Sequence, residues 1–385
     1  MRAGALVVCV AAAVLAACTQ VPDTDLQPGD TPDPDTTEAG LWMHMDRMEG
    51  ELRSSRQVVD DQALNDYLEQ ITCRLAPLYC GGIRIYVVEM PYFNATMAPN
   101  GMMEVWTGLL LRVENEAQLA FVLAHELEHY IKRHSLKRWV DLQNKSNAAS
   151  AFSILTSAAG VGYAGYMGEL VAMASLLSYS RDQEREADAA GAARLAKAGY
   201  DPRESARLWQ ALLEEKAVSK KREAWVFFST HPGAGERIEN LEAISRDTAT
   251  PPEVTAVGRA RMLAVLTPNW DDWLGDELTR GAFGESEVLF RRLQKSGNRP
   301  GLVHFYLGEL YRKRGEEGDL ERAIQSYGDA LQEPHAPARV HRSLGQSFRR
   351  SGRSAEARAA YEDYLQAAPD APDRAIVRFQ IERLR

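Results

Sequence analysis

Residues 116–134 of this 385-residue chain read EAQLAFVLAHELEHYIKRH, and this stretch decides how the rest of the sequence is interpreted. It contains no glycine or proline, and its apolar residues recur at the three- and four-residue spacing of one helix face. Asn115 precedes it as a candidate N-cap, and Lys132 and Arg133 lie near its end. The pattern therefore predicts an amphipathic helix that begins at Glu116.

Within this helix, His125 and His129 belong to an H-E-x-x-H motif. Residues four apart project from the same helix face, about 6 Å apart along the axis, so two imidazoles can hold one Zn²⁺ ion. Glu126 is rotated by about 100° and can reach a water molecule on the open side of that metal. The competing interpretation is an amphipathic helix that happens to carry two histidines, because so short a motif also occurs by chance.

A hydrolytic zinc site needs a third protein ligand and one open position. If the helix runs through His134, that residue is rotated by about 900° from His125 onto the opposite face, so we expect a solvated residue at the helix end. Residues 180–191 supply carboxylates instead, with Glu184 and Asp188 four apart on one face. One of them can bind metal while the other hydrogen-bonds a ligating histidine. An ordinary charged helix face is the alternative.

The two segments together resemble the M48 family of zinc metallopeptidases, which pairs H-E-x-x-H with a downstream E-x-x-A-D on a second helix. The second motif here is Glu184-Arg-Glu-Ala-Asp188. The resemblance implies one zinc ion per chain with three protein ligands, His125, His129 and Glu184. It also implies that Glu126 is the general base and that Asp188 supports a ligating histidine. Glu186 falls two residues out of register, on the wrong face, so we expect no role for it at the metal.

Two further segments carry the same resemblance, which covers roughly residues 60–245. Residues 94–110 look like the family's strand pair ahead of the active helix, and residues 229–232 with Arg237 look like its late active-site segment. His231 and Arg237 are candidate catalytic donors to the developing oxyanion. His231 could instead bind zinc as a fourth ligand and hold the enzyme latent, or merely cap a helix. Glu128 departs from the small residue that relatives often carry, and either tunes the zinc or points away.

Residues 103–107 alternate enough to predict an edge strand. In M48 relatives such a strand lies beside the cleft and pairs with an extended peptide, which would place Met103, Glu104 and Val105 against substrate. Main-chain pairing carries little sequence information, so the resemblance favours unfolded or misfolded proteins as substrates. An ordinary packed strand is the alternative.

The N-terminus predicts export and a lipid anchor. Residues 1–17 combine a basic start with a short apolar core, which is typical of a signal peptide. Residues 15–18, Leu-Ala-Ala-Cys, resemble a bacterial lipoprotein box, which implies lipid on Cys18 and membrane association. Thr19 at the next position favours the outer membrane. The alternatives are an uncleaved anchor and a simple secretory signal cut nearby. Residues 18–40 are rich in Pro, Asp and Thr and predict a flexible acidic tether.

Two cysteines remain in the exported chain, since Cys9 leaves with the signal peptide and Cys18 carries lipid. Cys73 and Cys80 lie seven apart and could close a small disulfide loop in an oxidising periplasm. Two unpaired buried thiols are the alternative.

The C-terminal third of the chain shows an internal repeat. Leu307-Gly308 with Tyr327 is echoed by Leu344-Gly345 with Tyr361, and the spacing is near that of the 34-residue tetratricopeptide (TPR) unit. Small residues let paired helices approach, and the aromatic rings fill the space between them. The resemblance to the TPR family implies a concave face that binds peptides or partner proteins, whereas a plain helical bundle is the alternative. A degenerate unit at residues 257–296 and a capping helix at 373–385 complete the expected solenoid.

Charge and length bound the remaining possibilities. The formal net charge of −9 argues against nucleic-acid binding, which usually needs a basic surface. The length suits two folded domains, a peptidase domain at residues 41–250 and a helical repeat domain at 251–385. Within the first of these domains, residues 146–180 carry Glu169 as their only charge, and this composition predicts an apolar helical hairpin. That hairpin lies on a membrane, covers the cleft or packs in the core.

We therefore expect a mainly α, α+β protein: a gluzincin-type zinc metallopeptidase domain with a small β-sheet, followed by an all-α TPR solenoid. Within M48 the sequence looks most like the beta-barrel assembly-enhancing protease group. That resemblance implies a lipid-anchored periplasmic endopeptidase that degrades misfolded or stalled outer-membrane proteins and docks to the outer-membrane assembly machinery through its TPR domain. The competing class is a non-catalytic or latent TPR scaffold or chaperone. The intact Glu126 argues against it, because a structural zinc site needs no base.

Overall fold

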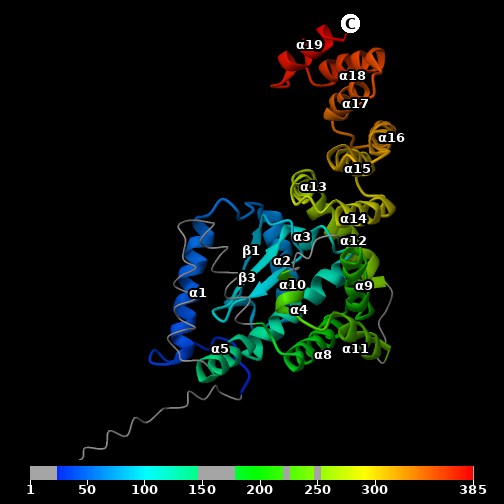
Figure 1. The fold of residues 1–385 in the computed structure, drawn as a ribbon. Coiled ribbons are helices and arrows are strands. Elements are labelled where there is room, and N and C mark those ends of the chain that lie inside the picture. The colour runs from blue at the N-terminus through cyan, green and yellow to red at the C-terminus, as the bar shows by residue number, and fades with distance from the viewer. Residues whose placement is uncertain (1–23, 146–177, 220–225, 247–252, 385) are drawn as a thin grey trace, which may run out of the picture.

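The computed structural model describes residues 24–145, 178–219, 226–246 and 253–384, and shows a mostly helical chain with one small sheet (Figure 1). The expected fold class is confirmed. The predicted signal peptide, Cys18 and all but the last three residues of the apolar 146–180 segment lie outside the described residues. Within the described ranges, no helix combines the length and the apolar character that crossing a membrane requires.

The sheet has three strands in the order β1 (Arg84–Val88), β3 (Met102–Trp106) and β2 (Ala95–Met97). Strand β3 pairs in parallel with β1 and antiparallel with β2, so it is the central strand. The prediction that Met103, Glu104 and Val105 form an edge strand is therefore wrong. All five residues of β3 are buried. Alternation of apolar and polar residues shows which residues of a strand share a face of the sheet. It does not show whether the strand is central, which here depends on the pairing of β3 with β1.

The two faces of the sheet are covered by different helices. Met103 and Val105 belong to a core formed with α2 (Gln62–Leu75), α4 (Glu116–Ile131) and α9 (Arg203–Ala217). Met102 and Trp106 face the other way, into a second cluster with α1 (Thr37–Ser54) and α5 (His134–Lys145). The sheet thus lies between α1 and α4, as Figure 1 shows.

Helix α4 begins where the sequence predicts and ends earlier than expected. The Asn115 side chain accepts a hydrogen bond from the Gln118 backbone N–H at 3.0 Å, which caps the first turn. The helix ends at Ile131, and Arg133 adopts a left-handed φ of 53°. That backbone reversal starts a new helix, α5, at His134. His134 therefore does not lie on α4, and its predicted place on the opposite face of a continuous helix is wrong.

The predicted flexible tether is also shorter than residues 18–40. Leu26 is buried, its N–H donates to the Ile131 carbonyl at 2.8 Å, and its carbonyl accepts from the Tyr79 hydroxyl at 2.8 Å. Helix α1 then begins at Thr37, with Thr36 as its cap. The ion pairs of Asp25 with Lys132 and of Asp30 with Arg133 add to these contacts. This part of the predicted tether therefore packs against the folded domain.

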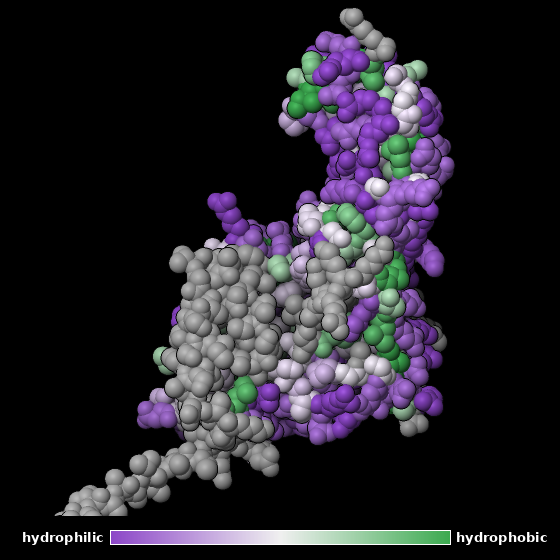
Figure 2. Space-filling model, in the orientation of Figure 1, coloured by the Kyte–Doolittle hydropathy of each residue, from purple (hydrophilic) through white to green (hydrophobic). Residues whose placement is uncertain are grey.

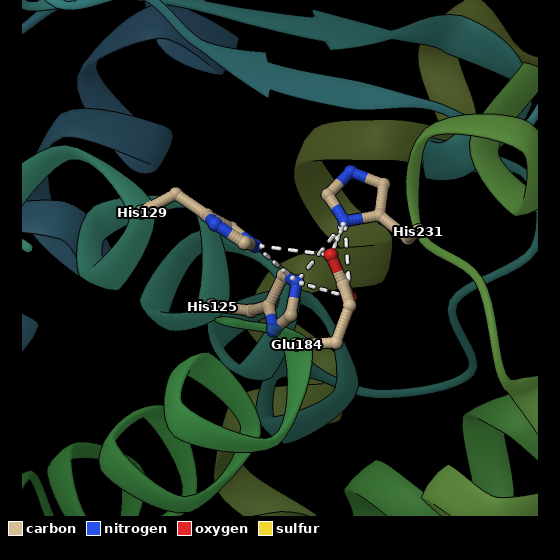
Figure 3. A group of neighbouring side chains, drawn as sticks. All are labelled: His125, His129, Glu184 and His231. Atoms are coloured by element: carbon tan, nitrogen blue, oxygen red, sulfur yellow. Dashed lines mark hydrogen bonds and ion pairs between the residues drawn. The ribbon is translucent and has the colours of Figure 1, made fainter. Parts of the chain in front are cut away.

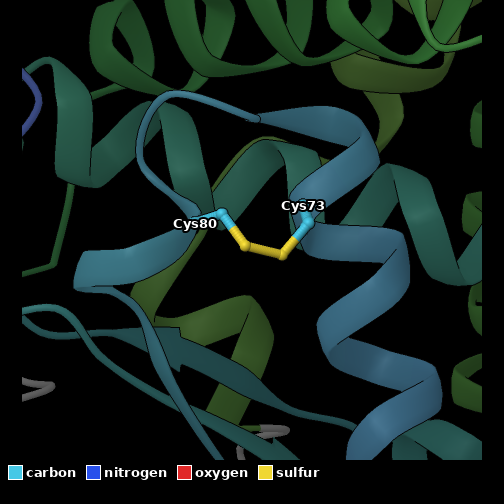
Figure 4. Close-up of a disulfide and its surroundings, with 2 residues drawn as sticks. All are labelled: Cys73 and Cys80. Atoms are coloured by element: carbon cyan, nitrogen blue, oxygen red, sulfur yellow. A yellow bond between two sulfur atoms is a disulfide. The ribbon is translucent and has the colours of Figure 1, made fainter.

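Cys73 and Cys80 form a disulfide, with 4.8 Å between their Cα atoms (Figure 4). Cys73 lies in the last turn of α2, and Cys80 begins the short 3₁₀ turn that leads into β1. The bond therefore holds the α2–β1 connection.

Helices α12 to α19 extend away from the sheet toward the C-terminus (Figure 1). Their bounds are α12 Glu253–Leu266, α13 Trp270–Thr279, α14 Phe283–Ser296, α15 Pro300–Arg314, α16 Asp319–Leu331, α17 Arg339–Arg350, α18 Ser354–Ala367 and α19 Arg374–Glu382. A Cβ on Gly308 would lie 2.4 Å from the Tyr327 ring, and one on Gly345 would lie 2.5 Å from the Tyr361 ring. The α15–α16 and α17–α18 pairs thus pack through the glycine–tyrosine contacts that the repeat pattern predicts.

A buried ion network joins the peptidase side of the chain to these helices. Arg112, in the turn between α3 (Thr107–Leu110) and α4, donates to Glu215 of α9 at 2.8 Å and to Glu277 of α13 at 3.1 Å. All three side chains are buried, and one hydrophobic cluster continues from α2 to α18. The core is continuous across residue 250, so the boundary between 41–250 and 251–385 stays a prediction from sequence pattern.

Candidate metal centre

Two helices bring the predicted site together. Helix α4 carries His125, Glu126 and His129, and α8 (Arg181–Lys197) carries Glu184 and Asp188. The first turn of α8 is fixed by a capping box, in which Ser180 and Gln183 exchange side-chain and backbone hydrogen bonds. Gly191 lets α8 approach α4 closely, since a Cβ there would lie 3.3 Å from the His125 backbone nitrogen.

Four donor atoms converge between these helices, from His125, His129, Glu184 and His231 (Figure 3). His231 follows α10 (Val226–Thr230), and its Nδ1 lies 3.0 Å from Glu184 Oε1 and 3.3 Å from His125 Nε2. His129 Nε2 lies 3.0 Å from His125 Nε2 and 3.5 Å from Glu184 Oε1. All four residues are buried. Three imidazoles and a carboxylate supply the nitrogen and oxygen donors that zinc takes, in the number of a tetrahedral site.

Asp188 lies behind His125, as expected. Its Oδ1 is 3.1 Å from His125 Nδ1, which leaves His125 Nε2 pointing into the cluster. Such a contact fixes the tautomer and the ring orientation of a ligating histidine.

Arg237, on α11 (Ala234–Arg246), contacts the carboxylates of Asp188 and Glu184. It donates two hydrogen bonds to Asp188, at 2.6 and 2.7 Å, and its Nη1 lies 2.7 Å from Glu184 Oε2. Its guanidinium stacks over the Trp209 ring at 4.1 Å. Although burial alone would raise it, His231 and Arg237 hold the pKa of Glu184 well below its usual range. The predicted role as an oxyanion donor does not fit these contacts, which suit a residue that positions the ligands.

Glu126 lies beside the cluster without joining it. Its Oε1 is buried, makes no hydrogen bond and lies 3.5 Å from His231 Nε2. Burial raises the pKa of Glu126, against the opposing charges of His231 and His125. A carboxylate so placed is prepared to accept a proton.

His134 is a functional neighbour that the sequence reasoning missed. It is buried, and its Nδ1 lies 2.9 Å from His129 Nδ1, while its Nε2 lies 3.3 Å from Glu186 Oε2. Burial lowers the pKa of His134 to about 4, against the opposing effect of Glu186. The prediction that His134 is solvated is therefore wrong. Glu186 does not reach the metal cluster itself, but it contacts His134, which contacts His129. The left-handed turn at Arg133 makes this possible, and no residue pattern around Arg133 marks such a turn.

Tyr179 is a second residue missed from the sequence. Its ring stacks on the His129 imidazole, with 3.7 Å between centroids and 14° between planes. Its hydroxyl lies 2.9 Å from Ser135 Oγ, and its N–H donates to the Thr230 carbonyl. Tyr179 thus connects the start of α8, the start of α5 and the end of α10 around one ligating ring. In the sequence, an aromatic residue before a helix N-cap does not predict a contact with a metal-binding histidine.

The unusual Glu128 points away from the cluster. Arg194 of α8 donates to it at 2.6 Å and also to the Leu75 carbonyl at the end of α2. Glu128 therefore ties α4 to α8 and α2, which settles the alternative left open by the sequence.

A small pocket of about 90 Å³ opens beside Glu126 and His231. Four methionines line this pocket, namely Met45, Met48, Met97 and Met102, and Met97 belongs to strand β2. Next to β2, the Ala98 N–H donates to the Met102 carbonyl and the Asn94 carbonyl accepts from the Trp106 N–H. Because backbone groups alternate along a strand, the amide groups of Ala95 and Met97 point away from β3. No strand among the described residues pairs with that side. Strand β2, not β3, is the edge next to the metal cluster.

Comparison with known proteins agrees with this geometry. Residues 62–245 match the sequence model of Peptidase family M48. This segment is an M48 peptidase domain. M48 metallopeptidases use zinc, and His125, His129, Glu184 and His231 all lie within the matched M48 segment.

Several known proteins are similar to this chain. The mitochondrial metalloendopeptidase OMA1 of Schizosaccharomyces pombe is 31% identical over 159 residues, 41% of this chain and 45% of that protein. A putative beta-barrel assembly-enhancing protease of Vibrio cholerae is 28% identical over 257 residues, 63% of this chain and 51% of that protein. The beta-barrel assembly-enhancing protease of Escherichia coli is 25% identical over 197 residues, 48% and 40% of the two chains. This chain thus spans about half the length of these relatives.

Proposed function

We propose that this protein is a zinc-dependent endopeptidase that cleaves unfolded or misfolded proteins. The observation that carries the proposal is the buried four-donor cluster with Glu126 beside it. A structural zinc site needs only its ligands. Glu126 adds a buried carboxylate whose Oε1 accepts no hydrogen bond, and such a group can act as the base in hydrolysis.

His125, His129 and Glu184 would hold the ion, with Asp188 and His134 orienting the two imidazoles. When bound, zinc would polarise the peptide carbonyl and lower the pKa of a water molecule to about 7. Glu126 accepts the proton of that water and returns it to the leaving amine. Arg237 keeps Glu184 and Asp188 ionised by its charge.

His231 gives the site a latent form. Its Nδ1 already lies among the other three donors, so it would serve as a fourth ligand and fill the position that water needs. Displacing His231 would then open the site, and its Nε2 lies near Glu126, where it could donate to a developing oxyanion.

Substrate pairing with the edge strand β2 follows from the sheet order. An extended peptide beside Ala95 and Met97 would pass the methionine-lined pocket and Glu126. Backbone pairing and flexible methionines select little sequence, which suits unfolded chains.

The cellular setting is proposed from the signal peptide, the lipoprotein box and the named relatives. The chain would be anchored to the outer membrane by lipid on Cys18, would act in the periplasm on misfolded or stalled outer-membrane and envelope proteins, and would dock to the assembly machinery through its TPR-like helices. The similarity to beta-barrel assembly-enhancing proteases supports this setting. A latent scaffold remains the second candidate, favoured by the position of His231 among the ligands.

Casein hydrolysis by the wild type and by Glu126→Gln separates the two functions. We expect the variant to keep one zinc ion per chain and to lose activity by at least about 100-fold, the usual contribution of general acid–base catalysis. Zinc content measured by mass spectrometry controls for loss of the metal. Equal activity of the two proteins with zinc bound would remove Glu126 as the base. Wild-type protein that binds zinc and cleaves no unfolded substrate would favour the scaffold.

A further inference from the structure

A second site lies in the C-terminal helices, far along the chain from the zinc cluster. Helices α15, α17, α18 and α19 enclose a pocket of about 460 Å³. Four arginines line it, Arg312, Arg342, Arg349 and Arg350. Of the described residues that line the pocket, Asp373 supplies the one carboxylate. We call this site the arginine pocket. Its charge is opposite in sign to the net charge of −9 of the whole chain.

Two side-chain donors in the arginine pocket have no acceptor. Tyr361 is 1% exposed, and its buried hydroxyl has no hydrogen-bond partner. The Nε of Arg342 is likewise buried without a partner, although the same guanidinium is paired to Asp373 through Nη1. Buried polar groups are almost always hydrogen-bonded in native proteins. Two orphan donors that line one basic pocket therefore indicate an anionic acceptor that completes the site.

Arg312 is paired to Glu309 of its own helix, whereas Arg349 and Arg350 are held in place by neutral partners. Arg349 donates to the Gln380 side chain at 2.7 Å, and Arg350 donates to the Arg312 carbonyl at 3.5 Å. Each guanidinium has five N–H donors, so these contacts orient the planar groups and leave donors for a ligand. Planar guanidinium groups recognise carboxylates in a bidentate manner.

Apolar side chains lie next to the charged ones. Ile376 and Val377 of α19 line the same pocket, and Ile376 is 63% exposed. On the face that Figure 2 shows, hydrophilic residues predominate over the C-terminal helices, with a few apolar residues among them. A small inorganic anion would fill little of this volume, given that a water molecule takes about 30 Å³. A ligand that carries a carboxylate and an apolar group together matches the lining.

We propose that the arginine pocket binds the C-terminal residue of a partner protein, with its α-carboxylate on the arginines and Tyr361 and its apolar side chain on Ile376 and Val377. A chain end presents both groups on one residue, which a single pocket can enclose. The proposal rests on the docking role proposed above and gives it a location and a ligand class.

Fluorescence polarisation of the full chain with labelled glycine–serine peptides tests this pocket. One peptide ends in leucine with a free carboxylate, the second is its amide, and the third is the amide with a glutamate before the leucine. We expect the free carboxylate to bind at least about tenfold more tightly than either amide. Tyr361→Phe, which keeps the ring against Gly345, should weaken binding of the free carboxylate several-fold with no loss of stability.

The charge-reversal pair Arg349→Glu/Arg350→Glu should weaken binding by at least about tenfold. Its matched control is Lys313→Glu/Arg378→Glu, which changes the charge equally at exposed positions outside the pocket and should have less than about a twofold effect. Equal binding of acid and amide, equal losses in both charge-reversal pairs, or displacement of the peptide by sub-millimolar inorganic phosphate would each overturn the proposal. Casein hydrolysis by the same variants should be unchanged, so a failure here is distinct from a failure of the peptidase function.

Discussion

His129 and His134 face each other through their Nδ1 atoms at 2.9 Å, although a left-handed residue and a helix boundary separate them in the chain. His129 Nε2 points into the metal cluster, so with a metal on that atom the proton of the ring would lie on Nδ1, which would donate to His134. His134 would then carry its proton on Nε2, toward Glu186. The arrangement mirrors that of His125 with Asp188, so each ligating imidazole of α4 has its own partner.

His134→Ala should therefore weaken zinc binding by about 10- to 100-fold, the usual cost of removing a partner of a ligating histidine. Competition with a chromophoric chelator measures the affinity, and far-ultraviolet circular dichroism checks the fold. His304→Ala, on α15, is the matched control and should leave the affinity unchanged. If His134→Ala binds zinc as tightly as the wild type, His134 has no positioning role.

His231→Ala should retain one zinc ion per chain, because His125, His129 and Glu184 remain, and should raise casein hydrolysis by opening the fourth position. Activity and zinc content are measured on the same preparation. A fall in activity with zinc retained would instead identify His231 as the oxyanion donor. Unchanged activity and unchanged zinc affinity would remove it from the site.

Gly345→Ala should destabilise the C-terminal helices by about 1–3 kcal/mol, because the added methyl group would lie 2.5 Å from the Tyr361 ring and the core cannot yield without strain. Gly328→Ala, on α16 of the preceding helix pair, is the control. Nothing lies within 4 Å of its added methyl, so the variant should gain about 0.5–1 kcal/mol from helix propensity. Urea denaturation followed by tryptophan fluorescence measures both, and changes of the same sign would contradict the helix-pair packing.

Glu49 should make α1 docking sensitive to acid. Although burial alone would raise it, hydrogen bonds from Arg84, Tyr86 and Asn100 lower the pKa of Glu49 below 4.5. A carboxyl whose pKa is lower in the folded state stabilises the fold above its unfolded pKa, and the effect is lost as pH falls through the folded value.

Glu49→Gln should accordingly be less stable than the wild type at pH 7, and the difference should shrink as the pH falls below about 4.5. Denaturation midpoints at a series of pH values measure this. A difference that stays constant from pH 7 to 3 would show that the charge of Glu49 does not contribute.

The chemistry of the site could be read from local spacing. His125 and His129, like Glu184 and Asp188, are one helical turn apart, and a helix fixes which residues share a face wherever it lies in the molecule. Gly345 and Tyr361 were predictable for a related reason, since a repeated pattern of small and aromatic residues implies close helix pairs. The convergence of α4 on α8 came from family resemblance, because spacing alone does not say which helices meet.

The sequence and its family resemblance therefore predicted the helical class, the grouping of His125, His129 and Glu184 with Glu126, and Cys73 and Cys80 as a candidate pair. Only the tertiary structure decided that β3 is the central strand, that Leu26 anchors the N-terminal segment, that Arg237 binds the carboxylates Asp188 and Glu184, and that His134 lies behind His129. Each of these depends on a contact between segments distant in sequence or on a backbone reversal at one residue. Periodicity encodes neither, because it reports only which face of its own element a side chain occupies.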